Sequence, residues 1–426
     1  KELFQVLNAV VKEELAVNNR NVWRNEIVVL LCIGEIFLMM GLSFLSPILP
    51  KFIKSLGIEA QAIGIAVGLA ITAFGAARAI MDIPAGMIAK RFGRRFLLVG
   101  APLVVLISAL GCAFTTEYWQ LIIWRILQGA GAASYSVAAL IVLGEISETS
   151  NRGLYISFFW TAALIGASFG PTLGGFMGEY FGYRAVFFCY AALALLAVIW
   201  GYFRIPETSL KQNKAQLRSE DPNLVERKNS SRFLFNGNFI LISLVALLTL
   251  VTIGGTQATL VPLVGYEYLS LREGQVGISL TVIAIMQVIL SPVAGRFSDK
   301  IGRKKLIVLG GVISALGLIM FVQSSSYWFF LFSALVLGLG RGIGAPVPTA
   351  YVSDIALKEN YESTLACFRA VSDLGWVIGP LLCGYLKDIA GLSLPFYLTA
   401  AMLFLIVILF GIFGKETVVR KEKFIR

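Results

Sequence analysis

Long apolar segments recur along the whole chain, and they constrain its fold more than any other feature. Each is close to the roughly 20 residues with which an α-helix crosses a bilayer core about 30 Å thick. Only 14% of the residues are charged and 57% are hydrophobic, too little charge for the surface of a water-soluble protein of this length. The sequence therefore predicts an all-α membrane protein with twelve transmembrane helices. The predicted spans are 27–50, 61–84, 97–115, 119–143, 154–177, 184–203, 238–264, 275–295, 306–323, 328–352, 362–385 and 395–414.

A charged stretch at 204–237, with Ser, Asn and two prolines, divides the twelve segments into two groups of six. Such a composition indicates a solvated linker on the cytoplasmic side. We therefore predict an N-terminal six-helix bundle at 27–203 and a C-terminal one at 238–414, with a cytoplasmic tail at 415–426. Residues 1–26 place apolar side chains on one stripe, which is typical of a cytoplasmic amphipathic arm on the membrane surface. A regulatory partner site is the alternative.

The basic residues are distributed unevenly, and this predicts the orientation. Most of the 36 Lys and Arg fall in the arm, in alternate loops and in the tail. By the positive-inside rule, both termini are expected in the cytoplasm, with the protein multi-pass in the plasma membrane. This topology explains the net charge of +11, so no nucleic-acid partner is needed. We expect a monomer in the lipid bilayer.

The chain contains no histidine, so carboxylates would have to carry any transported protons. Its five cysteines form no CxxC pair, and no metal site is expected. Neither a P-loop nor a nucleophile–base set is present, which argues against an enzyme and against ATP as the energy source. We expect no cofactor and a proton gradient as the energy source.

The two halves repeat at an offset of 209 positions. The segment GPTLGG begins at Gly170 and its copy GPLLCG at Gly379, and GMIAKRFGRR begins at Gly86 and GRFSDKIGRK at Gly295. Parallel six-helix halves related about the membrane normal are a transporter architecture with the substrate site between them near the bilayer midplane. The sequence therefore predicts two parallel-repeat bundles around one central site.

These motifs resemble those of the major facilitator superfamily, over essentially residues 27–414, and in particular those of its twelve-helix drug:proton antiporters. GMIAKRFGRR and its copy resemble the superfamily signature G-x-L-A-D-R-x-G-R-R. The glycines are expected to allow close helix approach, and the basic clusters to pair with acids that latch the outward-facing state and separate on inward opening. A topology anchor is the alternative. The residues of this expected gate are Gly86, Lys90, Arg91, Gly93, Arg94, Arg95, Glu145, Gly295, Asp299, Gly302, Arg303 and Asp354.

One position departs from the family pattern. The first copy of the signature has Lys90 where the second has Asp299, and in the family an Asp there caps a helix of the opposite half. Two alternatives follow: Asp82, two turns back, substitutes for the missing acid, or gating depends on the second half.

The stretch GASFGPTLGG fits the antiporter signature G-x-x-x-G-P-x-x-G-G at every fixed position. Gly166, Gly170 and Gly174 lie on one helical face, Pro171 is expected to bend the helix, and Gly175 completes the motif. Small residues at this spacing allow close packing, which we expect at a seam between the halves. The resemblance implies an exporter; the alternative is a glycine packing face with no directional meaning.

Charges within the spans are candidates for proton coupling, because charge inside a membrane is costly. Glu35 lies in the first span without an evident local partner, and removal from water favours the neutral form of a carboxyl group. It is expected to exchange a proton for substrate and to attract cations; a structural hydrogen bond is the alternative. Arg125, in LIIWRILQGAGAA, resembles the family's R-x-x-Q-G signature, which implies help in proton movement. Its alternative role is to bind backbone carbonyls.

Two further carboxylates are candidates for proton coupling. Asp373 lies four residues after Arg369, and Asp82 lies four residues after Arg78. An i,i+4 ion pair within each helix is the alternative at both positions.

Aromatic residues occur on the helices expected to surround the central site. An aromatic cavity with one or two acids suits lipophilic cations, whereas most membrane aromatics pack on lipid or neighbouring helices. The candidates are Phe37, Phe44, Tyr135, Phe158, Trp160, Tyr266, Tyr351 and Trp376.

The resemblance thus implies a proton-coupled antiporter that exports lipophilic or cationic small molecules, as in multidrug efflux, by alternating access. The alternatives are a dedicated exporter of a single metabolite or lipid, an uptake symporter of the same fold, and a non-transporting receptor. Broad stimulation of proton flux by drugs separates the first two.

Overall fold

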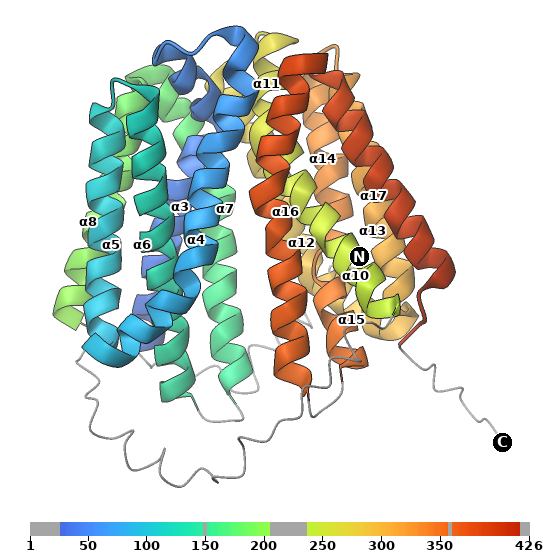
Figure 1. Ribbon diagram of the computed structural model, residues 1–426, viewed down its shortest axis with the longest axis horizontal. Coiled ribbons are helices and arrows are strands. Elements are labelled where there is room, and N and C mark those ends of the chain that lie inside the picture. Colours follow the sequence, from blue (N-terminus) through green and yellow to red (C-terminus); the bar gives the residue numbers. More distant parts are fainter. Residues whose placement is uncertain (1–25, 148–150, 205–236, 357–359, 418–426) are drawn as a thin grey trace, which may run out of the picture.

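A computed structural model describes residues 26–147, 151–204, 237–356 and 360–417 (Figure 1). Most of the predicted arm, linker and tail lies outside the described residues. Within those residues, twelve helical segments are long and apolar enough to cross a membrane. This confirms the all-α membrane fold.

The first half contains six spanning helices and one short 3₁₀ helix, η1 at Ala60–Ala62. The spanning helices are α3 (Glu26–Ser55), α4 (Ile63–Phe92), α5 (Arg94–Phe114), α6 (Tyr118–Ile146), α7 (Arg152–Phe181) and α8 (Tyr183–Arg204). The predicted ranges end short of several of these helices, because charged residues continue a helix beyond its apolar part. The helix α4, predicted to end at residue 84, ends at Phe92.

The second half repeats this arrangement with two interrupted spans. Its elements are α10 (Gly237–Val251), η4 (Thr252–Leu260), α11 (Val261–Glu267), α12 (Glu273–Ile301), α13 (Arg303–Val322), α14 (Tyr327–Gly344), α15 (Val347–Ile355), α16 (Tyr361–Ala390) and α17 (Ser393–Phe413). The span at 238–264 was predicted as continuous. Its middle, η4, is a π-helix, in which Thr259 donates to the carbonyl of Gly254 at 2.8 Å, five residues back.

The repeat predicted from the sequence is visible in the backbone. Gly93 ends α4 with a φ of 94°, and Gly302, 209 positions later, ends α12 with a φ of 112°. Only glycine adopts this region at little cost, which explains its presence at both signature loops.

The two halves meet along two equivalent seams, α4 against α16 and α7 against α12. A Cβ atom on Gly68 would lie 2.8 Å from the carbonyl carbon of Pro380, and one on Gly277 would lie 2.9 Å from that of Pro171. Both members of one contact lie 209 positions from those of the other. The seams therefore follow the same pseudo-twofold relation as the motifs.

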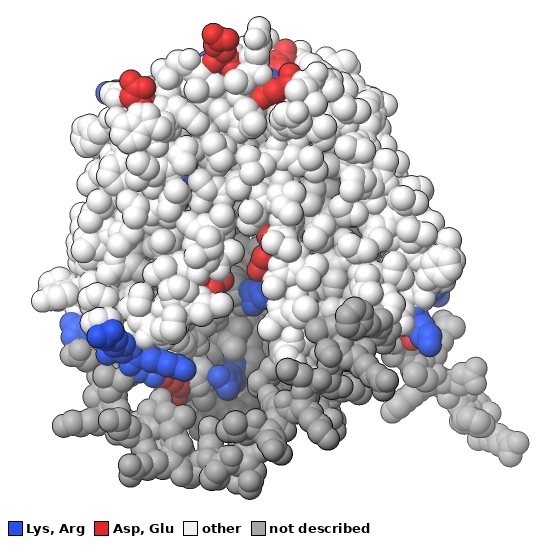
Figure 2. All heavy atoms as spheres, in the orientation of Figure 1, with Lys and Arg blue, Asp and Glu red and all other residues white. Residues whose placement is uncertain are grey.

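The two ends of the bundle differ in charge. Figure 2 shows Lys and Arg at the lower end of the view and Asp and Glu at the upper end. We call the lower end the basic end; its exposed cations include Lys90, Arg91, Lys300 and Lys305. It carries the loops for which a cytoplasmic location is predicted. The other end is called the opposite end below.

Candidate functional site

A cavity of about 650 Å³ lies between the halves. Its wall comes from α3, α4, α6, α7 and α16 and from the seventh span, and it opens toward the basic end (Figure 2). Apolar side chains of α3, including Leu42, Leu45 and Leu49, line it. The charged side chains in the wall are Arg78, Asp82, Arg125, Arg369 and Asp373. The structure thus brings three of the four proton-coupling candidates to one cavity.

Side chains from both halves close the cavity toward the opposite end. The Tyr266 hydroxyl donates to the Pro47 carbonyl, and the Lys51 ammonium lies 4.4 Å from the Tyr266 ring centroid. Lys51 Nζ also pairs with a Glu273 oxygen at 3.0 Å, which accepts a hydrogen bond from Tyr183 at 3.0 Å. Tyr266 therefore belongs to this closure, and its assignment to the cavity wall is wrong.

Two carboxylates bind helix N-termini of the other half at this end. Asp388 of α16 accepts hydrogen bonds from the amides of Gly64, at 3.0 Å, and Ile65, at 2.7 Å, where α4 begins. Glu179 of α7 accepts one from the Gly274 amide of α12 at 3.2 Å. Asp388 lies 209 positions after Glu179, so comparing the halves could have found these caps, which sequence analysis missed. These hydrogen bonds hold the opposite end closed, and each helix N-terminus stabilises the negative charge of the carboxylate bound to it.

The glycine stripe of α7 packs mainly within its own half. A Cβ on Gly166 would lie 2.5 Å from the Ile36 carbonyl oxygen, and one on Gly170 would lie 2.7 Å from that of Met40, both in α3. A Cβ on Gly174 would also meet the backbone of α3. For these three glycines the predicted seam between the halves is wrong, because their face is turned to α3.

Gly175 and Pro171 face the other half. A Cβ on Gly175 would lie 2.9 Å from the carbonyl carbon of Glu273, and the Pro171 carbonyl lies against Gly277 of α12. The motif therefore contacts two helices: its glycine stripe packs on α3, and its last glycine packs on α12.

The expected gate pairs form inside each half. Arg94 Nε donates to Glu145 Oε1 at 3.0 Å, and the Arg303 guanidinium pairs with Asp354 and, at 3.0 Å, with Asp299. Both clusters are intact while the cavity is open to the basic end. The expectation that these pairs latch the outward-facing state and separate on inward opening is therefore wrong; they join neighbouring helices of one half.

The remaining signature residues lie at the basic end. Lys90 is exposed and, among the described residues, has no ion pair within 4.0 Å. Asp82 lies in the cavity wall, and its substitution for the acid missing at position 90 stays a prediction. A Cβ on Gly86 or Gly295 would meet no atom within 4 Å, so the expected close helix approach there is wrong with this end open.

The two other arginines of the first signature lie against aromatic rings. Arg95 donates to the Tyr202 carbonyl at 2.8 Å, and Arg91 lies 5.3 Å from the Phe92 ring centroid. Both contacts stay within the first half.

Glu35 is completely buried between α3 and α6. The Ser136 hydroxyl donates to Glu35 Oε1 at 3.3 Å, which agrees with the alternative of a structural hydrogen bond, while proton exchange at Glu35 stays a prediction. Ser136 also lines the cavity, and it therefore lies between Glu35 and the cavity. No sequence signal marks Ser136, which is 101 positions away.

Arg125 is buried and makes two hydrogen bonds and one contact with an aromatic ring. It donates to the Ala70 carbonyl at 3.2 Å and to Gln128 Oε1 at 2.7 Å, and it lies 4.8 Å from the Phe74 ring centroid. These contacts agree with the alternative role as a partner for backbone carbonyls. Its role in proton movement stays a prediction.

The charges of α4 and α16 are not paired along their helices. Among the described residues, no ion pair within 4.0 Å joins Arg78 to Asp82 or Arg369 to Asp373, so the i,i+4 alternative is not realised. Arg369 instead lies 5.3 Å from the ring centroid of Trp160, on α7 of the other half.

Of the eight aromatic candidates, only Trp160 and Trp376 line the cavity. Phe44 and Tyr351 are core residues with 1% and 0% exposure, and Phe158 packs against the hydrophobic core. These three assignments to the cavity are wrong, because helical position alone does not tell which face meets the cavity.

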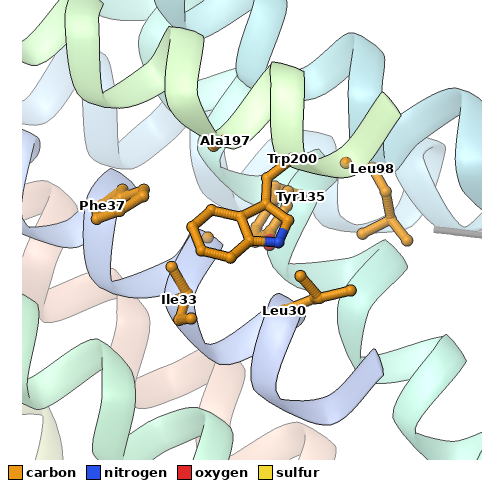
Figure 3. A pocket seen from close by; sticks show the side chains of 9 residues that line it. Leu30, Ile33, Phe37, Leu98, Tyr135, Ala197 and Trp200 are labelled. Atoms are coloured by element: carbon orange, nitrogen blue, oxygen red, sulfur yellow. The ribbon is translucent and has the colours of Figure 1, made fainter. Parts of the chain in front are cut away.

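Phe37 and Tyr135 line a different, small pocket on the outside of the first half (Figure 3). It has a volume of about 10 Å³ and is bounded by Trp200 of α8 and Leu98 of α5. Their assignment to the cavity is also wrong, because this face of α3 is turned away from the other half.

Sequence comparisons agree with this architecture. The model of a family described as the Major Facilitator Superfamily matches residues 31–272 and 242–425. An uncharacterised transporter of this type from Methanocaldococcus jannaschii is 26% identical over 356 residues, covering 83% of this chain and 89% of the relative. The multidrug resistance efflux pump PmrA of Streptococcus pneumoniae is 26% identical over 368 residues, with 86% and 90% covered. The class B tetracycline resistance protein of Escherichia coli is 26% identical over 345 residues, with 80% and 84% covered.

Solved structures show the same fold. A D-xylose–proton symporter matches with a TM-score of 0.74 at 18% identity, covering 92% of this chain and 98% of that one. A bacterial homologue of the human lysosomal transporter Spinster, solved in an inward-facing and occupied conformation, matches with a TM-score of 0.76 at 14% identity, with 90% and 95% covered. This family and fold are those of membrane transporters and not of enzymes. The chain belongs to the major facilitator superfamily.

Proposed function

We propose that the protein is a proton-coupled antiporter that exports lipophilic or cationic small molecules from the cell by alternating access. It acts as a monomer in the plasma membrane with both termini cytoplasmic, and the proton gradient supplies the energy without a cofactor. The observation that carries the proposal is a cavity between the halves with a buried carboxylate, Glu35, reached through Ser136 in its wall.

The two seams support alternating access. Glycines and carboxylate caps hold the opposite end closed while the basic end is open, so the cavity accepts substrate from the side predicted to be cytoplasmic. Rocking of the halves would open the seams and close the basic end, as expected for parallel repeats around a fixed site.

Electrostatics supports coupling between Glu35 and the cavity. Arg78 interacts electrostatically with Glu35 and also with Asp82 and Asp373. A cationic substrate group at these acids adds positive potential near Glu35, which favours release of its proton. Binding of a proton and binding of substrate would then be mutually exclusive, as antiport requires.

The direction of transport rests on the antiporter motif and on relatives. GASFGPTLGG has every fixed residue of the exporter signature, and several relatives are named multidrug efflux pumps. Dedicated export and uptake symport remain the competing functions; a panel of drugs in a proton-flux assay tests the first, and the direction of substrate accumulation tests the second.

The test uses proteoliposomes with a pH-sensitive dye in the lumen and an imposed pH gradient. We expect lipophilic cations to trigger proton movement in the wild type, and Glu35→Gln to lose it. The matched control, Glu59→Gln, changes an exposed carboxylate at the opposite end and should behave as the wild type does. If no compound of a broad drug panel moves protons in the wild type, drug antiport is refuted. If Glu35→Gln retains the response, Glu35 is not the coupling residue.

A further inference from the structure

The helices α4 and α16 face each other across the cavity, and each carries an arginine followed four residues later by an aspartate. The four residues, Arg78 and Asp82 with Arg369 and Asp373, all line the cavity. We call them the charge quartet. Residues four apart lie on one helical face, so each helix presents both of its charges to the other. The quartet has two positive and two negative charges and is neutral overall.

The contacts between α4 and α16 fix their register. The Thr72 hydroxyl donates to the Val377 carbonyl at 2.7 Å, and a Cβ on Gly75 would lie 2.7 Å from Cδ1 of Trp376. The helices run antiparallel, so as residue numbers increase along α4, the numbers of the facing residues decrease by the same amount along α16. Figure 1 shows the two helices close together at the upper end and diverging toward the basic end.

The quartet lies one to two turns beyond the last of these contacts. Continuing the register places Arg78 opposite Asp373 and Asp82 opposite Arg369, so that each arginine faces an aspartate of the other half. In the open structure no ion pair within 4.0 Å joins the four among the described residues; each aspartate interacts electrostatically with the arginine of its own helix and, more weakly, with the arginine of the opposite helix. Closing the basic end along this register would form two ion pairs between the halves.

This register restricts which ligands the closed cavity can hold. A substrate with a single charge pairs with one member of the quartet and leaves the opposing charge unmatched, so it binds less tightly than a substrate with both charges. A substrate with both charges replaces the lost ion pair and leaves the quartet together with its ligand neutral. The third arginine of the wall, Arg125, lies on α6, outside the register between α4 and α16, and donates to Ala70 and Gln128.

We propose that the charge quartet is a recognition site for amphipathic zwitterions, whose ammonium and acidic groups pair with aspartate and arginine of opposite halves. The apolar body of such a ligand lies against Trp160 and Trp376, which flank the quartet. The proposal rests on the proposed function in taking the cavity as the substrate site. Zwitterions carry the cationic group that this function requires, together with an acidic group that the proposed function does not specify.

The test compares three fluorescent probes that share one dansyl-lysine scaffold and differ in charge. Nε-dansyl-lysine is a zwitterion, its methyl ester is a cation, and its Nα-acetyl derivative is an anion. Binding to the full chain in detergent is measured by energy transfer from tryptophan to dansyl. We expect the wild type to bind the zwitterion at least about tenfold more tightly than either other probe, which corresponds to about 1.4 kcal/mol.

Charge variants test whether the quartet causes this preference. Arg78→Asp makes the quartet acidic and should reverse the preference in favour of the ester, and the milder Arg78→Gln should abolish the preference of the zwitterion over the ester. The charge exchange Arg78→Asp/Asp373→Arg restores a neutral quartet and should restore the preference for the zwitterion. Thermal unfolding with unchanged midpoints shows that each variant is folded.

Two results would overturn the proposal: equal binding of the ester and the zwitterion by the wild type, or an unchanged preference in Arg78→Asp. These binding measurements need no proton gradient. A zwitterion preference without substrate-driven proton flux would therefore reject the proposed antiport and leave this proposal standing, and proton flux without the preference would do the reverse.

Discussion

Alanine at the glycines of the two seams should shift the protein toward the state that is closed at the basic end. In Gly68→Ala the new Cβ would lie 2.8 Å from the Pro380 carbonyl carbon, well inside the 3.4 Å at which ordinary contact begins. The atom in the way belongs to the backbone, so a change of side-chain rotamer cannot relieve the clash and the helices must move apart. Overpacking of this kind costs about 1–3 kcal/mol, and it falls only on the state in which the seam is closed.

The expected shift is large enough to measure. A free-energy difference of about 1–3 kcal/mol changes the ratio of the two states by roughly 5- to 150-fold. Gly277→Ala, at the equivalent seam position, should shift the ratio in the same direction, since its Cβ would lie 2.9 Å from the Pro171 carbonyl carbon. The control is Gly100→Ala, where a Cβ would meet nothing within 4 Å.

The assay is pulsed electron spin resonance between spin labels at Lys90 and Ser363, two exposed positions near the basic ends of α4 and α16. The five native cysteines are first replaced. We expect both seam variants to gain the population with the shorter distance and the control to keep the wild-type distribution. Unchanged distributions in both seam variants would show that the seams do not set the balance between the two states.

Three further predictions concern the closure and the cavity. Asp388→Asn removes the charge that caps α4, should destabilise the closed opposite end by about 1–2 kcal/mol, and should shift the same distance distributions toward closure of the basic end. Ser136→Ala removes the hydroxyl that contacts the buried carboxylate and should slow substrate-driven proton flux several-fold, whereas Ser134→Ala, whose hydroxyl bonds its own helix at 2.8 Å, should not. Trp376→Ala should weaken substrate binding about tenfold, measured by titration in detergent, whereas Trp200→Ala, at the outer pocket, should leave it unchanged.

Much of the fold follows from the sequence, because hydrophobic length and internal repetition are properties of the chain itself. The twelve spans and the offset of 209 positions relate directly to helices and seams in the structure. Periodicity also showed that Gly166, Gly170 and Gly174 share one face. It does not say which helix that face meets, and the structure turns it to α3 of the same half.

The charged residues of the site could be predicted from the sequence, but most of its other residues could not. Charges inside a membrane are costly wherever they lie, so Asp82, Arg125 and Asp373 could be singled out without knowing their neighbours. Aromatic side chains are favourable on every face of a membrane helix, and six of the eight aromatic candidates lie away from the cavity. Ser136 carried no signal at all, because its role depends on its position next to Glu35.

Proton-coupled antiport and symport differ in the compartment in which the substrate accumulates, and this direction can be measured. Proteoliposomes are prepared with an acidic lumen in an alkaline medium, and also with the gradient reversed, and a substrate identified in the proton-flux assay is followed. The account predicts that the substrate accumulates in the acidic compartment in both arrangements, because protons leaving that compartment drive substrate into it. Accumulation in the alkaline compartment would show symport and contradict the account.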